Sequence, residues 1–127
     1  MPSQASMKAV LEAYIEGLNA RDADAVLALF APDAEIEDPV GSRVRRGSEL
    51  DAWFRSAVQV EPHLELEAPI RGSHGESAAM AFTVSTQRKN GRFLTRAVDV
   101  VHFDDVGRIR RLEGYWGPED RRRVSDP

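Results

Sequence analysis

The spacing of apolar residues changes once along this sequence, near residue 60, and this change limits the possible folds more than any other feature. Before it, apolar residues recur every three or four positions, which is typical of amphipathic helices. After it, they alternate with polar residues, which is typical of half-buried strands. Helical segments followed by antiparallel strands predict an α+β fold, with three N-terminal helices packed on one face of a curved, mostly antiparallel sheet. Such a layout can enclose a cone-shaped pocket.

The helical part divides into three segments. The first begins near Ser6, its expected N-cap. The second begins at Asp22 or Asp24 and ends before Pro32, which cannot continue a helix. The third begins at Ser48, where a cap precedes an acidic first turn. Their apolar faces carry Met7, Val10, Leu11, Tyr14, Ile15 and Leu18; then Val26, Leu27, Leu29 and Phe30; then Leu50, Trp53, Phe54, Ala57 and Val58.

The alternating part predicts strands over residues 64–70, 78–86, 93–103 and 109–116, and a short strand over residues 34–38 lies between the second and third helices. Asn90-Gly91 is a hairpin signal, and a second turn is expected over residues 104–107. The alternation breaks at Arg110 and Arg111, which predicts a bulge in the last strand.

Length and charge restrict the class of protein. The 127 residues fit one domain spanning residues 1–127, with flexible tails expected at 1–5 and 119–127. A net charge of −4 disfavours nucleic acid as a partner. There is no apolar run of the roughly 18 residues that a membrane span needs. The first residues lack the features of a signal peptide, so a cytoplasmic location is expected.

Cysteine and histidine usage argues against several kinds of site. The chain has no cysteine, which excludes disulfides, thiol nucleophiles and thiolate metal sites. His63, His74 and His102 are too scattered to form a zinc motif. We therefore expect no metal and no cofactor.

Three polar side chains stand on apolar faces of the predicted elements. Asp38 alternates in phase with Ile36, and Asp99 in phase with Val101, so both carboxyl groups are expected to face the interior. Tyr14 lies on the apolar face of the first helix. Each has a simpler explanation: a turn or cap for Asp38, packing for Tyr14, and a salt bridge across the sheet to Arg96 or Arg110 for Asp99.

Together the three side chains suggest chemistry. An ionised carboxylate can move a proton, while two neutral O–H donors stabilise the oxyanion that its removal creates. Burial raises the pKa of an aspartate and so keeps it a donor. This is the equipment for proton abstraction next to a carbonyl, in a pocket that suits a rigid hydrophobic substrate. The expected pocket residues are Leu18, Phe54, Val58, Met80, Phe82, Val84, Val101, Leu112 and Trp116.

Several short motifs between residues 7 and 117 occur together in one known family. They are Asn19-Ala-Arg-Asp22, Ala28-Leu-Phe-Ala31, Ile36-Glu-Asp-Pro-Val-Gly-Ser42, Arg45-Arg-Gly47, Ala78 to Ser85, Asp99 ahead of Phe103, and Gly107-Arg-Ile109. With them the sequence resembles the bacterial ketosteroid isomerases, or steroid Δ5-isomerases, of the nuclear-transport-factor-2-like, SnoaL-like superfamily. The run ending at Ser42 is specific, whereas the first two motifs are common to the superfamily.

The resemblance implies a role for each polar residue. Asp38 would take the C4 proton of a 3-oxo-Δ5-steroid and return it to C6, while Tyr14 and Asp99 hydrogen-bond the dienolate oxygen at C3. It also implies a cone-shaped α+β fold, a small hydrophobic steroid as ligand, and a homodimer paired through its sheets. Phe30 and Arg55 stand where relatives carry tyrosines that support the catalytic tyrosine. An Arg55 side chain reaching the pocket would favour an anionic or more polar substrate.

Two alternatives remain on the same fold. The first is a SnoaL-like cyclase, dehydratase or hydrolase acting on another hydrophobic carbonyl or epoxide substrate. The second is a ligand-binding domain without catalysis, which would have no need for a base opposite two acidic donors.

Overall fold

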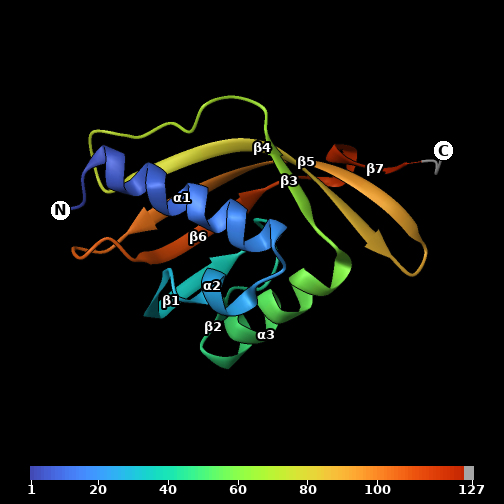
Figure 1. Cartoon of the computed structure of the whole chain (residues 1–127), viewed down its shortest axis with the longest axis horizontal. Coiled ribbons are helices and arrows are strands. Elements are labelled where there is room, and N and C mark those ends of the chain that lie inside the picture. The colour runs from blue at the N-terminus through green and yellow to red at the C-terminus, as the bar shows by residue number, and fades with distance from the viewer. Residues whose placement is uncertain (125–127) are drawn as a thin grey trace.

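Helices cover one face of a curved sheet (Figure 1). A computed structural model describes residues 1–124 of the chain. Its helices are α1 (Gln4–Asn19), α2 (Ala23–Leu27) and α3 (Ser48–Ala57), with short 3-10 turns η1 (Val58–Val60) and η2 (Pro118–Asp120). Its strands are β1 (Phe30–Glu37), β2 (Arg45–Arg46), β3 (His63–Leu66), β4 (Ser77–Arg88), β5 (Gly91–Phe103), β6 (Ile109–Tyr115) and β7 (Arg121–Val124). The predicted α+β architecture is confirmed.

The seven strands form one mixed sheet. Six follow the order β2-β1-β6-β5-β4-β3, and β7 pairs with β5. The β1–β6 pair is parallel, and the other named strand pairs are antiparallel. The first strand of the chain therefore lies beside the sixth, which joins the N-terminal helical part to the C-terminal hairpins.

Turns and a bulge lie where the sequence predicted them. Asn90 precedes Gly91, whose φ of 131° is a conformation that glycine adopts without steric cost, and this turn joins β4 to β5. The pairing of β5 with β6 shifts register between His102 and Phe103, because His102 faces Arg111 while Phe103 faces Ile109. Arg110 is the extra residue of this bulge.

Two helix boundaries differ from the prediction, and a third matches one of its alternatives. The side chain of Ser3, not Ser6, caps α1 by accepting the backbone N–H of Ser6 at 3.0 Å. Asp22 caps α2, as one of the two predicted alternatives. This helix ends at Leu27, because Phe30 already pairs with β6 in β1. Pairing between distant strands thus overrode the helical spacing around Phe30.

The C-terminal segment also differs from the prediction. The expected tail over residues 119–127 is wrong for residues 119–124, which form η2 and β7. The register of β7 places Arg121 opposite Thr95 on β5, and the Arg121 side chain also bonds to Thr95. The expected tail over residues 1–5 is likewise shortened, since α1 begins at Gln4. Residues 125–127 lie outside the described residues.

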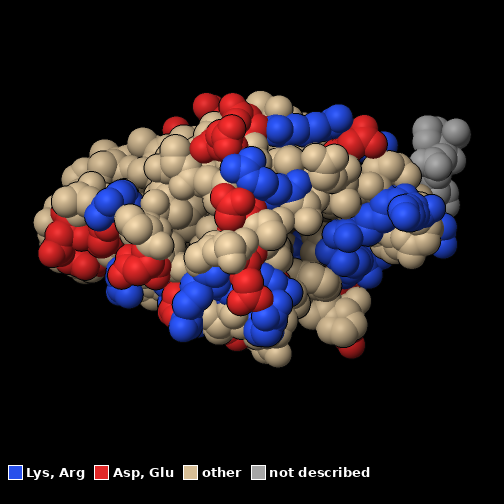
Figure 2. Space-filling view, turned by 90° about the horizontal axis from the view of Figure 1, so that it is seen from below, with Lys and Arg blue, Asp and Glu red and all other residues tan. Residues whose placement is uncertain are grey.

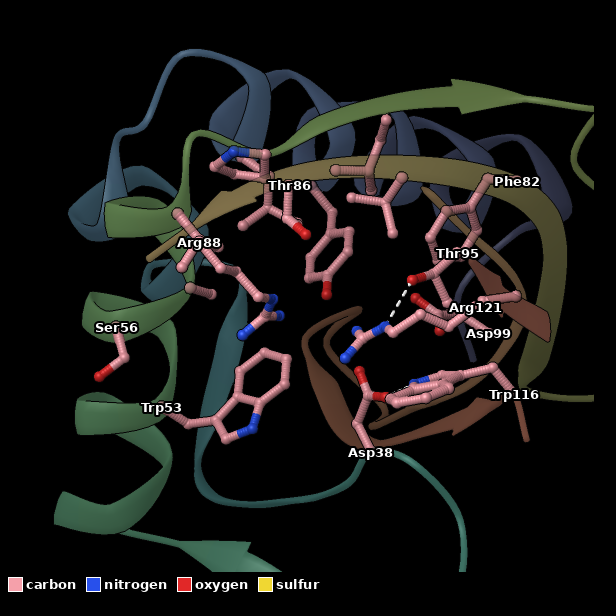
Figure 3. Close-up of a pocket in the computed structure, with 18 residues that line it drawn as sticks. Asp38, Trp53, Ser56, Phe82, Thr86, Arg88, Thr95, Asp99, Trp116 and Arg121 are labelled. Atoms are coloured by element: carbon pink, nitrogen blue, oxygen red, sulfur yellow. Dashed lines mark hydrogen bonds between the residues drawn. The ribbon is translucent and has the colours of Figure 1, made fainter. Parts of the chain in front are cut away.

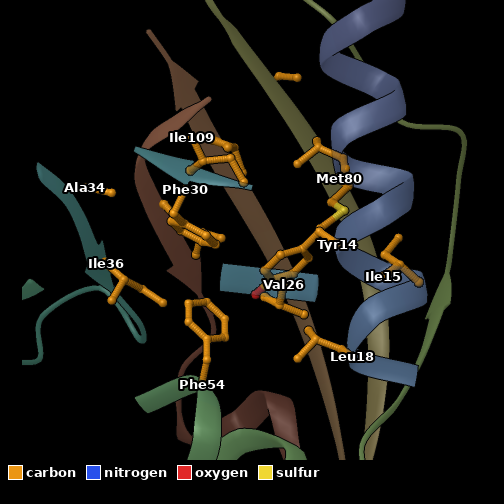
Figure 4. Close-up of a cluster of buried hydrophobic side chains, with 14 of the residues drawn as sticks. Tyr14, Ile15, Leu18, Val26, Phe30, Ala34, Ile36, Phe54, Met80 and Ile109 are labelled. Atoms are coloured by element: carbon orange, nitrogen blue, oxygen red, sulfur yellow. The ribbon is translucent and has the colours of Figure 1, made fainter. Parts of the chain in front are cut away.

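Buried side chains from the helices and the inner face of the sheet form one core. An aromatic group lies at its centre, where Tyr14 of α1, Phe54 of α3 and Phe30 of β1 meet (Figure 4). Within the described residues, no helix is long and apolar enough to cross a membrane.

Phe103 is 0% exposed in the core, so removal of its ring should be costly. Phe103→Ala should lower the free energy of unfolding by about 3–5 kcal/mol, because a cavity replaces the ring. Urea unfolding measures the change. Val106→Ala is the matched control: Val106 is 73% exposed in the following turn, and its loss should cost no more than about 0.5 kcal/mol. Equal costs for the two variants would contradict the assigned core.

Candidate active site

A cavity of about 350 Å³ lies between the helices and the inner face of β4 and β5 (Figure 3). Its apolar walls include Leu18, Trp53, Leu64, Phe82, Val84 and Trp116. Asp38, Asp99 and Tyr14 all line this cavity. The structure therefore brings together three side chains that are separated by up to 85 positions in the sequence.

Asp38 follows the last residue of β1, where the alternation of that strand turns its side chain inward. Ile36 is fully buried, whereas Glu37 points outward and pairs with Arg111. The peptide bond between Asp38 and Pro39 is cis. The indole N–H of Trp116 donates a hydrogen bond to Asp38 Oδ1 at 3.1 Å.

A glycine makes room for the Asp38 carboxylate. A Cβ on Gly114 of β6 would lie 2.5 Å from Asp38 Cγ, so the carboxylate occupies the space of the missing side chain. The backbone N–H of Val40 donates to the Gly114 carbonyl at 2.7 Å and holds the loop that follows Asp38. The position of the carboxylate thus depends on β6 as much as on β1.

Asp99 lies directly beside this glycine. In the register of β5 with β6 it faces Gly114, and the Cβ positions of such pairs are about 4.5–5.5 Å apart. Asp99 is 2% exposed. Its neighbour Arg96 points to the other face and pairs with Glu67, so the salt bridge considered for Asp99 is not formed with Arg96. The two aspartates are neighbours on the floor of the cavity.

Tyr14 reaches the cavity from α1. Its ring is 3% exposed and packs edge-on against Phe54, with ring centroids 5.9 Å apart. The ring centroid of Phe30 lies 6.4 Å from that of Tyr14. Phe30 therefore contacts Tyr14 by ring packing and offers it no hydroxyl.

The electrostatics differ among the three groups. Burial, then the negative charges of Asp99 and Asp38, raise the pKa of Tyr14 well above its usual value. Burial and then the Asp38 charge raise the pKa of Asp99 well above 3.8. Burial also raises the pKa of Asp38, but the Trp116 hydrogen bond and the charges of Arg121 and Arg45 oppose that rise. Asp38 therefore ionises first, and its charge keeps Asp99 neutral.

This arrangement supplies one base and two neutral hydrogen-bond donors. An ionised Asp38 can accept a proton, while Tyr14 and a protonated Asp99 can donate hydrogen bonds to a negatively charged oxygen. Residues 1–124 contain no group of three or more acidic or histidine side chains arranged to hold a metal ion. The proton chemistry can be written with these side chains alone.

The predicted pocket residues divide into two groups. Four of them, Leu18, Phe82, Val84 and Trp116, line the cavity. The other five, Phe54, Val58, Met80, Val101 and Leu112, lie in the hydrophobic core and are not among the lining residues. Met80 and Val101 have the correct inward direction, but they lie beside and beyond Asp99, at the packed end of the enclosure. Alternation gives the face of a strand and not the depth along it.

Several polar lining residues escaped the sequence analysis. Thr86 and Thr95 share the inward direction of their strands, which was a usable signal, and both are buried. Arg121 lies in the segment that was expected to be a tail, so no pattern pointed to it. Arg55 is outside this cavity: its guanidinium bonds to Asp51 and Asp24 on the surface.

Comparison with known proteins identifies related enzymes. The chain is 32% identical over 117 residues to the steroid Delta-isomerase of Nocardioides simplex, covering 91% of this chain and 94% of that protein. It is 31% identical to the epoxide hydrolase LasB of Streptomyces lasalocidi over an alignment of 134 positions, which covers 100% of this chain and 47% of that protein.

A solved structure of a related enzyme has the same fold as this chain. The epoxide hydrolase/cyclase-like enzyme SalBIII, described as acting in pyran ring formation in the polyether salinomycin, superposes with a TM-score of 0.89 at 30% identity. The match covers 98% of this chain and 100% of that one. The sequence pattern of the SnoaL-like domain matches residues 11–112. The chain therefore belongs to the SnoaL-like family.

Proposed function

We propose that this protein is a steroid Δ-isomerase that moves the double bond of a 3-oxo-Δ5-steroid to the Δ4 position. One observation carries the proposal: Asp38, whose ionisation is favoured by a hydrogen bond and by nearby arginines, stands beside two hydrogen-bond donors whose pKa values are raised well above their usual values, in a cavity with apolar walls. This division is the established pattern of ketosteroid isomerases. The 32% identity to a steroid Delta-isomerase over 94% of that protein supports the same activity.

The reaction is an internal proton transfer. The Asp38 carboxylate removes a proton from C4, and the electrons of that C–H bond form the dienolate with its charge on the oxygen at C3. Asp38, now neutral, returns the proton to C6, and the conjugated 4-ene-3-one forms. The Trp116 hydrogen bond and the space above Gly114 limit how far the Asp38 carboxyl group can move between C4 and C6.

Tyr14 and Asp99 stabilise the intermediate. Their neutral O–H groups donate to the C3 oxygen, and each donor strengthens as charge develops there. The raised pKa values favour the protonated form of both donors. Leu18, Phe82 and Val84 contact the ring system and exclude water.

The proposal includes a homodimer paired through the outer face of the sheet. Val98 of β5 and Tyr115 of β6 face one another there and are 41% and 48% exposed. Two large apolar side chains at adjacent positions on an open sheet face suit a second copy of the chain.

A second candidate is hydrolysis or cyclisation of an epoxide. The similarity to an epoxide hydrolase and to an epoxide hydrolase/cyclase-like enzyme is at nearly the same identity as that to the isomerase. The two aspartates suit this chemistry as well: a neutral Asp99 would protonate the epoxide oxygen, while Asp38 would deprotonate the attacking hydroxyl or water.

Replacing the base tests the isomerase proposal. Asp38→Asn should lower the isomerisation of 5-androstene-3,17-dione by about 10²–10⁴-fold, because the amide cannot accept the C4 proton. Growth of the ultraviolet absorbance of the conjugated ketone measures the rate. Asp33→Asn is the matched control: Asp33 is exposed on the same strand, and this variant should keep the wild-type rate.

The outcomes separate the two candidates. An Asp38→Asn variant with full activity would remove Asp38 from the mechanism. A folded wild-type protein that leaves the steroid unchanged but opens an epoxide would favour the second candidate.

The buried acid should cost stability at neutral pH. The native pKa of Asp99 is raised above 3.8, so the stability it contributes is fully present below pH 3.8 and falls as the pH rises toward the native pKa, by about 1.4 kcal/mol per pH unit. Asp99→Asn removes this loss. The variant should be more stable than the wild type at pH 7, and the difference in urea unfolding should shrink toward pH 3.8.

A surface change controls for the loss of one negative charge. Asp105 lies in an exposed turn, and Asp105→Asn should give no pH-dependent difference in the free energy of unfolding. A stability difference for Asp99→Asn that stays constant between pH 4 and pH 7 would show that Asp99 titrates normally.

Gly114 should be essential for activity and not for folding. In Gly114→Ala the new Cβ would overlap the Asp38 carboxylate, which must move, while no backbone atom is among the close contacts. A displacement of about 1 Å can cost roughly 10²-fold in rate, so kcat should fall by that order with the unfolding midpoint little changed. Gly75→Ala is the control, because its Cβ would meet only Ser73 Oγ at 3.9 Å. Equal kcat values for both variants would contradict this role.

A further inference from the structure

The cavity has a second polar region that the proposed reaction does not use. Thr86 and Arg88 at the end of β4, with Thr95 of β5 and Arg121 of β7, line it together (Figure 3). Figure 3 shows the guanidinium groups of Arg88 and Arg121 turned toward the same space. On the face shown in Figure 2, basic side chains gather beside a hollow near the C-terminal end of the described chain.

Thr86 presents an unused hydroxyl to this region. The residue is 6% exposed, and its Oγ1 is the one buried side-chain oxygen or nitrogen for which the structure of residues 1–124 gives no hydrogen-bond partner. An orphaned buried hydroxyl costs free energy that a ligand oxygen would recover.

Arg121 is held in place without a carboxylate partner. Its Nε donates to Thr95 Oγ1 at 2.9 Å, and its guanidinium carbon lies 4.2 Å from the centre of the Trp116 ring. Among residues 1–124, the structure places no carboxylate oxygen within salt-bridge distance of either Arg121 or Arg88. The terminal nitrogens of Arg121 are therefore oriented and available to a ligand.

Two positive charges face one another here. Burial lowers the pKa of Arg121, the Arg88 charge lowers it further, and the Asp38 charge opposes both effects. An anion between the two guanidinium groups would remove their repulsion and form charge-assisted hydrogen bonds.

The separation from the reacting end suits a ligand that spans the cavity. The backbone of Thr95, which anchors Arg121, lies four residues from that of Asp99 along β5, or about 13 Å at the rise of a strand, whereas the Arg121 guanidinium itself lies over Trp116, the hydrogen-bond partner of Asp38. The stretch of β5 between them contributes Ala97, and Phe82 faces that residue from β4. An apolar wall therefore connects the proposed oxyanion donors with the two arginines.

We propose that Arg88, Arg121 and Thr86 form an anion subsite that binds a carboxylate or sulfate group at the end of the substrate remote from its reacting carbonyl. The substrate class is then an apolar ring compound with a ketone at one end and an anionic group at the other. The choice of a steroid as this compound rests on the proposed function.

The test uses steroids that cannot be turned over further. Testosterone 17-sulfate is compared with testosterone, and 3-oxo-4-pregnene-20-carboxylic acid with its methyl ester, so the two pairs separate sulfate from carboxylate recognition. Quenching of tryptophan fluorescence gives each Kd, since Trp53 and Trp116 line the cavity. At least one anion should bind roughly tenfold or more tightly than its neutral partner, as expected for hydrogen bonds to charged groups.

Single and double arginine variants test which residues cause the preference for anionic ligands. Arg88→Gln and Arg121→Gln should each reduce the ratio of neutral to anionic Kd, and the double variant should bring this ratio close to one. Arg122→Gln is the matched control, because Arg122 is the exposed neighbour of Arg121 on β7 and does not line the cavity. It should retain the wild-type ratio.

Equal Kd values within both ligand pairs in the wild type would overturn the subsite, as would a preference that survives in the double variant. A second pair of probes is independent of steroid recognition: 8-anilinonaphthalene-1-sulfonate and its uncharged analogue N-phenyl-1-naphthylamine. If the steroids do not bind but the sulfonate dye binds more tightly than the uncharged dye in an arginine-dependent way, the subsite stands and the steroid assignment fails. If neither dye nor steroid shows arginine-dependent binding, the subsite is wrong whatever the isomerase assay gives.

Discussion

Two carboxyl groups share the floor of one small cavity, where their burial, together with the repulsion between their charges, sets the electrostatics of the site. Asp38 occupies the space above Gly114, and Asp99 is paired with that same glycine across the sheet. Both cannot ionise cheaply at this separation. The Trp116 hydrogen bond lies only on the Asp38 side, so the proton stays on Asp99. A few contacts thus shift the pKa values of two chemically identical side chains to different extents, and the proposed function uses one as a base and the other as a donor.

The directions in which the strand side chains point could be predicted from the sequence. Side chains alternate strictly along a strand, so the inward direction of Asp38 followed from that of Ile36, and the inward direction of Asp99 followed from that of Val101. The change of hydrophobic spacing near residue 60 gave the α+β order. These signals are local, and the structure keeps the side-chain directions that they predict.

Features that depend on distant contacts could not be predicted in this way. Phe30 fits the spacing of a helix, yet its pairing with Ile109 draws it into β1. Arg121 enters the cavity because its strand pairs with β5, 26 residues earlier in the chain. Met80 lies in the core and Phe82 on the cavity, although both point inward on β4. Depth within the enclosure depends on which elements cover each strand, and the spacing of residues does not carry that information.

The parallel pairing of β1 with β6 has a consequence for how the protein matures. Asp38 and the indole that holds it are 78 positions apart, and they meet only when the first and sixth strands lie side by side. During synthesis the helices and β1 emerge before their partner exists. A nascent or truncated chain can therefore contain every helix and still leave Asp38 without its hydrogen-bond partner. The position of Asp38 beside Asp99 depends on the pairing of both β1 and β5 with β6, so the cavity takes its described form only in the closed sheet.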